Sequence, residues 1–116
     1  MKSCTFIIAV LFSIVITGDV YPKENRGAAE IILESGSRGN IAFPHSRHQD
    51  AISDCKTCHT LFPQKSGSIQ ALIAQGSLEK KQAMTVCQSC HKDMASREEK
   101  TGPTRCSKCH DKSLTK

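Results

Sequence analysis

The chain has 116 residues, a formal net charge of +5 and seven cysteines, with no tryptophan and only one tyrosine. A chain this short has little apolar surface to bury on its own. The scarcity of aromatic residues also argues against nucleic acid as a partner, because no stacking platform is available. The composition predicts one small domain whose core is incomplete without an added group.

The first 18 residues are typical of a secretory signal peptide. A basic start of two residues precedes an apolar run from Cys4 to Ile16, and two small residues follow. The run is shorter than the roughly 20 residues of a membrane-spanning helix, so export and cleavage are favoured over a retained anchor. We therefore expect a signal peptide at 1–18 and a mature domain at 19–116, located in the periplasm without stable membrane insertion.

A β hairpin is expected next. Two short apolar stretches, residues 30–34 and 40–43, flank a turn-rich stretch at residues 35–39. This pattern predicts two antiparallel strands joined by a tight connection. A proline ends the second strand, and a short helix is expected over residues 45–52.

The remaining chain predicts helices and loops. Residues 67–84 carry the best helical run, with a break near Gly76 and Ser77. Elsewhere we expect only short helical turns and loops. The fold class is therefore small, mostly irregular and helical, with one short two-stranded antiparallel element.

A Cys-x-x-Cys-His motif occurs three times, and this spacing is typical of c-type haem attachment. Two thiols one helical turn apart can bond to the two vinyl groups of a haem, while the next residue offers an imidazole to the iron. The copies are Cys55-Lys56-Thr57-Cys58-His59, Cys87-Gln88-Ser89-Cys90-His91 and Cys106-Ser107-Lys108-Cys109-His110. They predict three haem c groups, and they account for every cysteine beyond the signal peptide.

Two other uses of these cysteines are less favoured. Disulfides are common in small exported chains, but they do not require a histidine after each pair. Structural zinc sites use Cys-x-x-Cys pairs in sets of four ligands, and six cysteines with five histidines do not divide into such sets. Haem is the favoured reading. The three haems would form most of the core, so the apoprotein is expected to be largely unfolded.

Three haem irons have six axial positions. One histidine of each motif, His59, His91 or His110, fills one position on each iron. Only His45 and His48 remain, and residues three apart share a helix face, so this pair can serve two neighbouring irons. The third iron then takes Met84, Met94, a lysine or an exchangeable water, and spacing alone does not choose among them.

These features resemble the three-haem cytochrome c7 family, the small branch of the class III cytochromes c3. The resemblance rests on the hairpin, on Phe43-Pro44-His45-Ser46-Arg47-His48 and on the stretch from Cys90 to Cys106, and it covers roughly residues 28–112. It implies a cytochrome c3/c7-like fold in which closely packed haems form the core.

The resemblance also implies axial pairs. His45 would pair with His59 on the first haem, held by Cys55 and Cys58. His48 would pair with His91 on the second, held by Cys87 and Cys90. The third haem, held by Cys106 and Cys109, would take His110 and Met84. Family members with three bis-histidine haems have a histidine just before the second motif, where this chain has Met84.

The implied function is one-electron transfer by a monomeric periplasmic carrier rather than an enzyme. Expected partners are quinol-oxidising cytochromes of the inner membrane and reductases in the periplasm or outer membrane. The alternative is a haem-based sensor or enzyme in which the third haem is open or weakly bound.

Charge indicates less about partners than the formal value suggests. Without the signal peptide the net charge is +4, and six haem propionates would bring it to about −2 with ferrous irons. Basic residues gather around the last two motifs, where they form a docking face for an acidic partner or neutralise propionates. They are Lys92, Lys100, Arg105, Lys108, Lys112 and Lys116.

Overall fold

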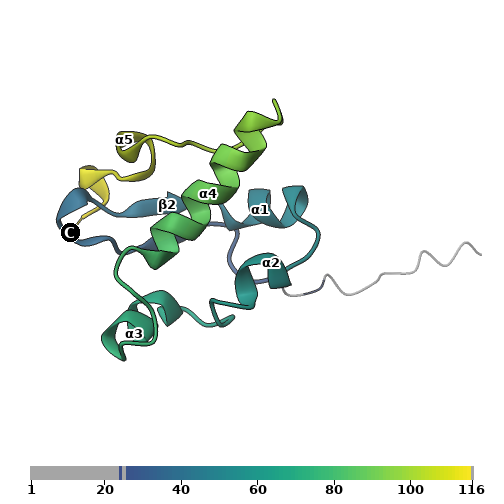
Figure 1. The fold of residues 1–116 in the computed structure, drawn as a ribbon. Coiled ribbons are helices and arrows are strands. Elements are labelled where there is room, and N and C mark those ends of the chain that lie inside the picture. The colour runs from purple at the N-terminus through teal and green to yellow at the C-terminus, as the bar shows by residue number, and fades with distance from the viewer. Residues whose placement is uncertain (1–23, 25, 116) are drawn as a thin grey trace, which may run out of the picture.

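The computed structural model describes residue 24 and residues 26–115, so the expected signal peptide lies outside the described residues. Two short strands come first and a set of short helices follows (Figure 1). In chain order the elements are β1 (Ile31–Leu33), η1 (Gly36–Arg38), β2 (Ile41–Phe43), α1 (His45–Ala51), α2 (Lys56–His59), α3 (Ser68–Ala74), α4 (Gln82–Ser96), α5 (Cys106–Cys109) and η2 (Lys112–Leu114).

The predicted hairpin is confirmed. Strands β1 and β2 pair antiparallel, with Ile31 opposite Phe43 and Leu33 opposite Ile41. The turn between them is the single 3-10 turn η1, and it is closed by a hydrogen bond from the Ser35 amide to Asn40 Oδ1 at 3.1 Å. The hairpin leads directly through a proline into α1, which is the short helix that was expected.

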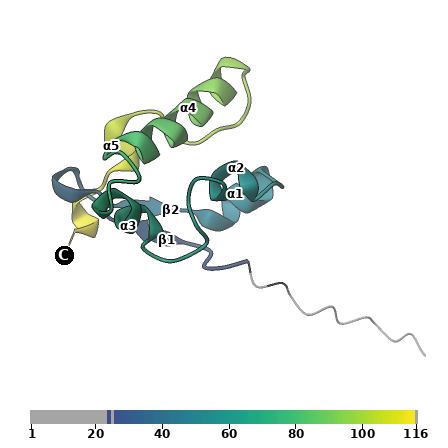
Figure 2. The same cartoon turned by 60° about the horizontal axis from the view of Figure 1, so that its bottom comes forward.

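The segment before β1 is attached to α1. The Ser46 amide donates to the Ala29 carbonyl at 2.9 Å, and Arg26 lies 3.8 Å from the carboxylate of Asp50. Helices α1 and α2 lie side by side in both views (Figure 1 and Figure 2). This arrangement brings the first motif close to the Phe-Pro-His-x-x-His segment.

The longest helix differs from the prediction. The helical run from residue 67 breaks at Gly76, as expected, where the backbone has φ of 72°. After that break α4 continues for 15 residues, from Gln82 to Ser96, and contains the whole second motif. The expectation of only short turns there was wrong, because no glycine or proline interrupts the chain between Gly76 and Gly102.

The C-terminal segment returns to the hairpin. The Asp111 amide donates to the Asn40 carbonyl at 2.9 Å, and the Asn40 side chain donates to the Leu114 carbonyl at 3.0 Å. The turn η2 consequently lies beside η1, as both views show (Figure 1 and Figure 2). The third motif is thereby held against the turn between the two strands.

The polypeptide forms almost no core of its own. Among the described residues, the only buried apolar side chains are Phe62 and Leu78, which are 8% and 3% exposed. The expected fold class is confirmed: mostly helical and irregular, with one short antiparallel pair. No helix in the described part of the chain has the length and apolar character needed to cross a membrane.

Candidate haem-binding sites

Each cysteine motif sits on a helical turn. The first is on α2, the second is inside α4, and the third is on α5 with its histidine at the end of the helix. The His59 amide donates to the Cys55 carbonyl at 3.0 Å, and the His110 amide donates to the Cys106 carbonyl at 2.9 Å. This turn places the two sulfur atoms on one side of the helix and starts the imidazole one residue further on.

The cysteines of the three motifs lie near one another. Desolvation raises the pKa of the Cys87 thiol, and charge repulsion from Cys58, Cys109 and Cys90 raises it further. Desolvation followed by repulsion from Cys90 likewise raises the pKa of the Cys58 thiol. Charge effects of this kind require proximity, so α4 brings its motif close to both of the others.

No alternative use of the cysteines is visible in this geometry. None of the six motif cysteines forms a disulfide bond. Within residues 24 and 26–115, no three His, Cys, Asp or Glu side chains converge so that they could hold a metal ion. The zinc hypothesis therefore has no support in the arrangement of the chain.

All five histidines share one orientation of the ring. In each, Nδ1 lies 2.8–3.0 Å from a backbone carbonyl oxygen, contributed in turn by Ala28, Pro44, Phe62, Pro103 and Gly39 for His45, His48, His59, His91 and His110. A carbonyl oxygen only accepts, so Nδ1 carries the proton and donates. The other ring nitrogen, Nε2, is then left with a free electron pair, which is the state that binds a metal.

Two pairs of imidazoles lie at nearly the same separation. The ring centres of His45 and His59 are 6.1 Å apart, and those of His48 and His91 are 6.0 Å apart. A metal–imidazole bond is about 2 Å long and the ring centre lies about 1 Å beyond the nitrogen, so one metal between two imidazoles separates their centres by about 6 Å. Both gaps therefore fit one iron atom.

Neighbouring residues hold these rings in place. Phe43 packs on His48 with ring centres 4.3 Å apart. Gly102 lies against His91 so closely that a Cβ atom there would be 2.6 Å from His91 Cε1. The Thr101 hydroxyl donates to the His91 carbonyl at 3.3 Å. The loop after α4 thus folds back over its own histidine.

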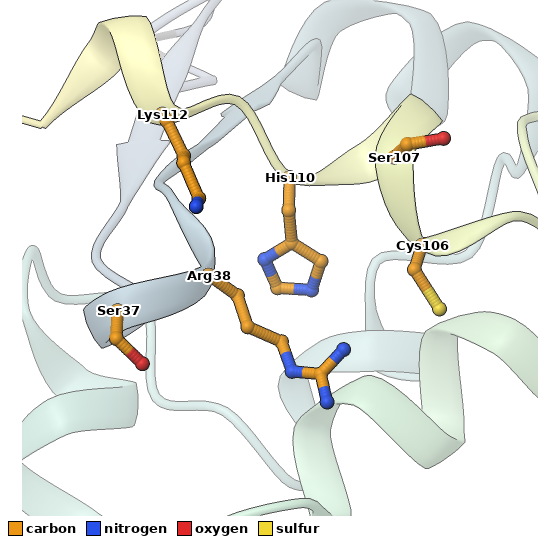
Figure 3. Close-up of a pocket in the computed structure, with 6 residues that line it drawn as sticks. All are labelled: Ser37, Arg38, Cys106, Ser107, His110 and Lys112. Carbon is orange, nitrogen blue, oxygen red and sulfur yellow. The ribbon is translucent and has the colours of Figure 1, made fainter.

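His110 has different surroundings. It projects into a hollow of about 440 Å³ lined by residues of η1, α5 and η2 (Figure 3). Each of the other four histidines is already paired with another histidine ring, with centres 6.0–6.1 Å apart. A second ligand on the side opposite His110 would therefore be another type of residue or solvent. Met84 lies in the first turn of α4 and is 44% exposed, while Met94 is half-buried further along the same helix.

A small chain with three Cys-x-x-Cys-His turns, five histidines whose Nε2 atoms are available to a metal, and very few buried apolar side chains among the described residues is a multihaem c-type cytochrome. The family described as cytochrome c7 and related cytochrome c matches residues 41–112. The chain belongs to this family, carries three haem c groups and is an electron-transfer protein.

Individual relatives agree. A cytochrome c7 from Geobacter metallireducens is 34% identical over 73% of this chain and 79% of its own length. A cytochrome c3 from Desulfovibrio desulfuricans is 32% identical over 66% of this chain and 82% of its own. The solution structure of the triheme cytochrome PpcA from Geobacter sulfurreducens superposes with a TM-score of 0.52, at 34% identity, over 72% of this chain and 99% of that one.

Several residues that shape the sites were not singled out from the sequence. The backbone of Gly39 contacts His110 and that of Gly102 contacts His91, while the Asn40 carbonyl holds the residue after His110. Such backbone contacts leave no signature in residue type beyond the glycines themselves. Gly102-Pro103 is predictable only as a break in the helix. Its second role, contacting His91 and accepting its hydrogen bond, depends on tertiary structure.

Proposed function

We propose that the protein carries single electrons in the periplasm through three haems whose iron ligands are mostly histidine pairs. His45 and His59 would bind the first haem iron, and His48 and His91 the second. The observation that carries the assignment is the 6.0–6.1 Å separation of both pairs, combined with Nδ1 donation that leaves each Nε2 free. The motif cysteines Cys55 and Cys58, and Cys87 and Cys90, would hold these two haems by thioether bonds.

For the third haem we propose Cys106, Cys109 and His110, with Met84 as the second axial ligand. Support comes from the use of all other histidines elsewhere and from the exposed position of Met84 in the first turn of α4. A thioether ligand raises the reduction potential relative to a second imidazole. The third haem would then be the site of highest potential, where electrons collect before they leave.

The carrier role follows from filled coordination. When bound, haem supplies an iron that cycles between the ferric and ferrous states, and two protein ligands on each iron leave no position for a substrate. Charge repulsion from Cys58 and Cys109 acts on Cys87, which indicates that the three motifs lie close together. Haems held by these motifs would be close enough to favour electron transfer between them. We infer a monomeric, non-enzymatic carrier that exchanges electrons with inner-membrane quinol-oxidising cytochromes and with periplasmic or outer-membrane reductases.

Carbon monoxide binding tests this proposal against its alternative, a haem-based sensor or enzyme. The absorbance spectrum of the fully reduced protein at neutral pH should not change under carbon monoxide, because every iron has two protein ligands. Rapid binding to one haem in three would show an open third site and would contradict the carrier assignment for that haem. A Met84→Ala variant serves as the positive control, since it should bind carbon monoxide at one haem.

A further inference from the structure

Two cationic side chains flank the imidazole of His110. Arg38 reaches toward this ring from η1, and Lys112 approaches from the chain that follows the motif (Figure 3). Both line the same hollow as His110 and Cys106. Arg38 is separated from His110 by 72 positions in the sequence, so only the fold brings these two residues together.

The backbone fixes both cations relative to His110. The Gly39 carbonyl accepts from His110 Nδ1 at 3.0 Å, and the next residue, Asn40, pairs with Asp111. Gly39 is buried with φ of 100°, and a Cβ atom there would lie 2.5 Å from the Asp111 carbonyl carbon. The backbone at residues 38 and 112 is therefore fixed where two chain segments pack tightly against each other, although both side chains reach solvent.

Neither cation has an acidic partner in the part of the chain that the structure describes. The ion pairs there involve Arg26 and Arg97 instead. No carboxylate lines the hollow. Asp111, which precedes Lys112 in the sequence, accepts hydrogen bonds from the amide and hydroxyl of Ser113 at 2.8 and 2.7 Å. The hollow thus presents two positive charges without a negative one.

We propose that Arg38 and Lys112 bind a carboxylate beside His110, supplied by a propionate of the third haem, and that they raise the reduction potential of this haem. The inference rests on the proposed function, which places a haem at His110. Guanidinium binds carboxylates through paired hydrogen bonds, and an ammonium adds a second point charge. Two nearby positive charges favour the ferrous state, because reduction removes one positive charge from the iron.

The test compares charge-neutralising variants of the holoprotein. Arg38→Gln and Lys112→Gln should each lower the ratio of ferrous to ferric third haem about fivefold at a fixed solution potential, or about 40 mV for a one-electron couple. Arg38→Lys should restore most of the effect, because it keeps the charge. Arg47→Gln, an identical change on the exposed face of α1, is the matched control and should leave the third haem unchanged.

Haem-resolved potentials from NMR redox titration give the readout, with three haems per chain verified first for each variant. Unchanged third-haem potentials in both Arg38→Gln and Lys112→Gln would overturn the inference while leaving the carrier function intact. An equal shift in Arg47→Gln would also overturn it, since the effect would then be one of net charge. If added citrate changes the third-haem potential of the wild-type protein at constant ionic strength, Arg38 and Lys112 bind a carboxylate from solution. That result would refute the propionate as their ligand. Absence of the third haem would instead contradict the proposed function.

Discussion

Replacing Gly102 tests how closely the loop after α4 packs against His91, a proposed haem ligand. In Gly102→Ala the new Cβ atom would lie 2.6 Å from His91 Cε1 and 2.9 Å from Nε2, while real Cβ contacts essentially never fall below 3.0 Å. The imidazole must therefore retreat by at least 0.4 Å. It cannot do so freely, because Nδ1 is bonded to the Pro103 carbonyl at 2.8 Å, one residue away from the new methyl group.

The expected cost follows from these contacts. Overpacking of a closely fitted site costs about 1–3 kcal/mol, and weakening the bond between His91 and Pro103 adds about 0.5–1.5 kcal/mol. We expect the free energy of unfolding of the holoprotein to fall by about 2–4 kcal/mol, based on both principles. The second haem should also change its potential and its NMR shifts, because His91 is its proposed ligand.

The assay is guanidinium unfolding followed by haem absorbance, together with NMR redox titration of each haem. Gly36→Ala is the matched control: its φ of 64° makes alanine unfavourable by about 1–2 kcal/mol, but no atom lies within 4 Å of the new methyl group. The control should therefore lose stability without affecting the second haem. If Gly102→Ala leaves the second haem unchanged and loses no more stability than Gly36→Ala, the steric reasoning is refuted.

Three further predictions follow from the sites. Met84→Ala should abolish the near-infrared band of a methionine-bound ferric haem and lower the third-haem potential, whereas Met94→Ala should do neither; the reverse result would identify Met94 as the ligand. Hydrogen bonds from Ser113 lower the pKa of Asp111 below its ordinary value of 3.8. The stability that these bonds give is therefore fully present above pH 3.8, and it is lost as the pH falls through the lower pKa of Asp111 in the folded protein. Ser113→Ala should raise the pKa of Asp111 in an NMR titration, and an unchanged value would contradict this cause. Chain produced without haem should lack stable structure by circular dichroism, because Phe62 and Leu78 are the only buried apolar side chains among the described residues. A cooperative unfolding transition would contradict the idea that haem forms the core.

Local structure was predictable wherever one short segment determines it. The hairpin followed from two apolar stretches around a turn-rich connection, and α1 followed from the proline that precedes it. Helix α4 was underestimated: only short turns were expected around the second motif, whereas its residue types are compatible with a continuous helix. Strong motifs in a sequence do not by themselves mark the ends of helices.

The haem motifs were recognisable from spacing alone, but the geometry that supports them was not. Which carbonyl receives each Nδ1 proton depends on contacts between segments as far apart as Gly39 and His110. The return of the C-terminal segment to Asn40 is of the same kind. Such contacts join backbone atoms, which every residue has, so residue type gives no signal for them.

Arg38 illustrates the same limit for charge. The sequence draws attention to basic residues near the last two motifs, including Lys112, because they are close along the chain. Arg38 belongs to the turn of the N-terminal hairpin and joins that group only through the crossing of residues 39–40 with residue 111. Charge patterns around a cofactor therefore have to be assembled from the fold.

The most direct test of the account is the haem content and the visible and near-infrared spectrum of the purified oxidised protein. We predict three haems per chain by pyridine haemochrome, low-spin spectra for all of them, and a weak near-infrared band from one methionine-bound iron. Fewer than three haems, or a high-spin iron in the oxidised protein, would contradict the arrangement of two histidine pairs and one His110–Met84 pair.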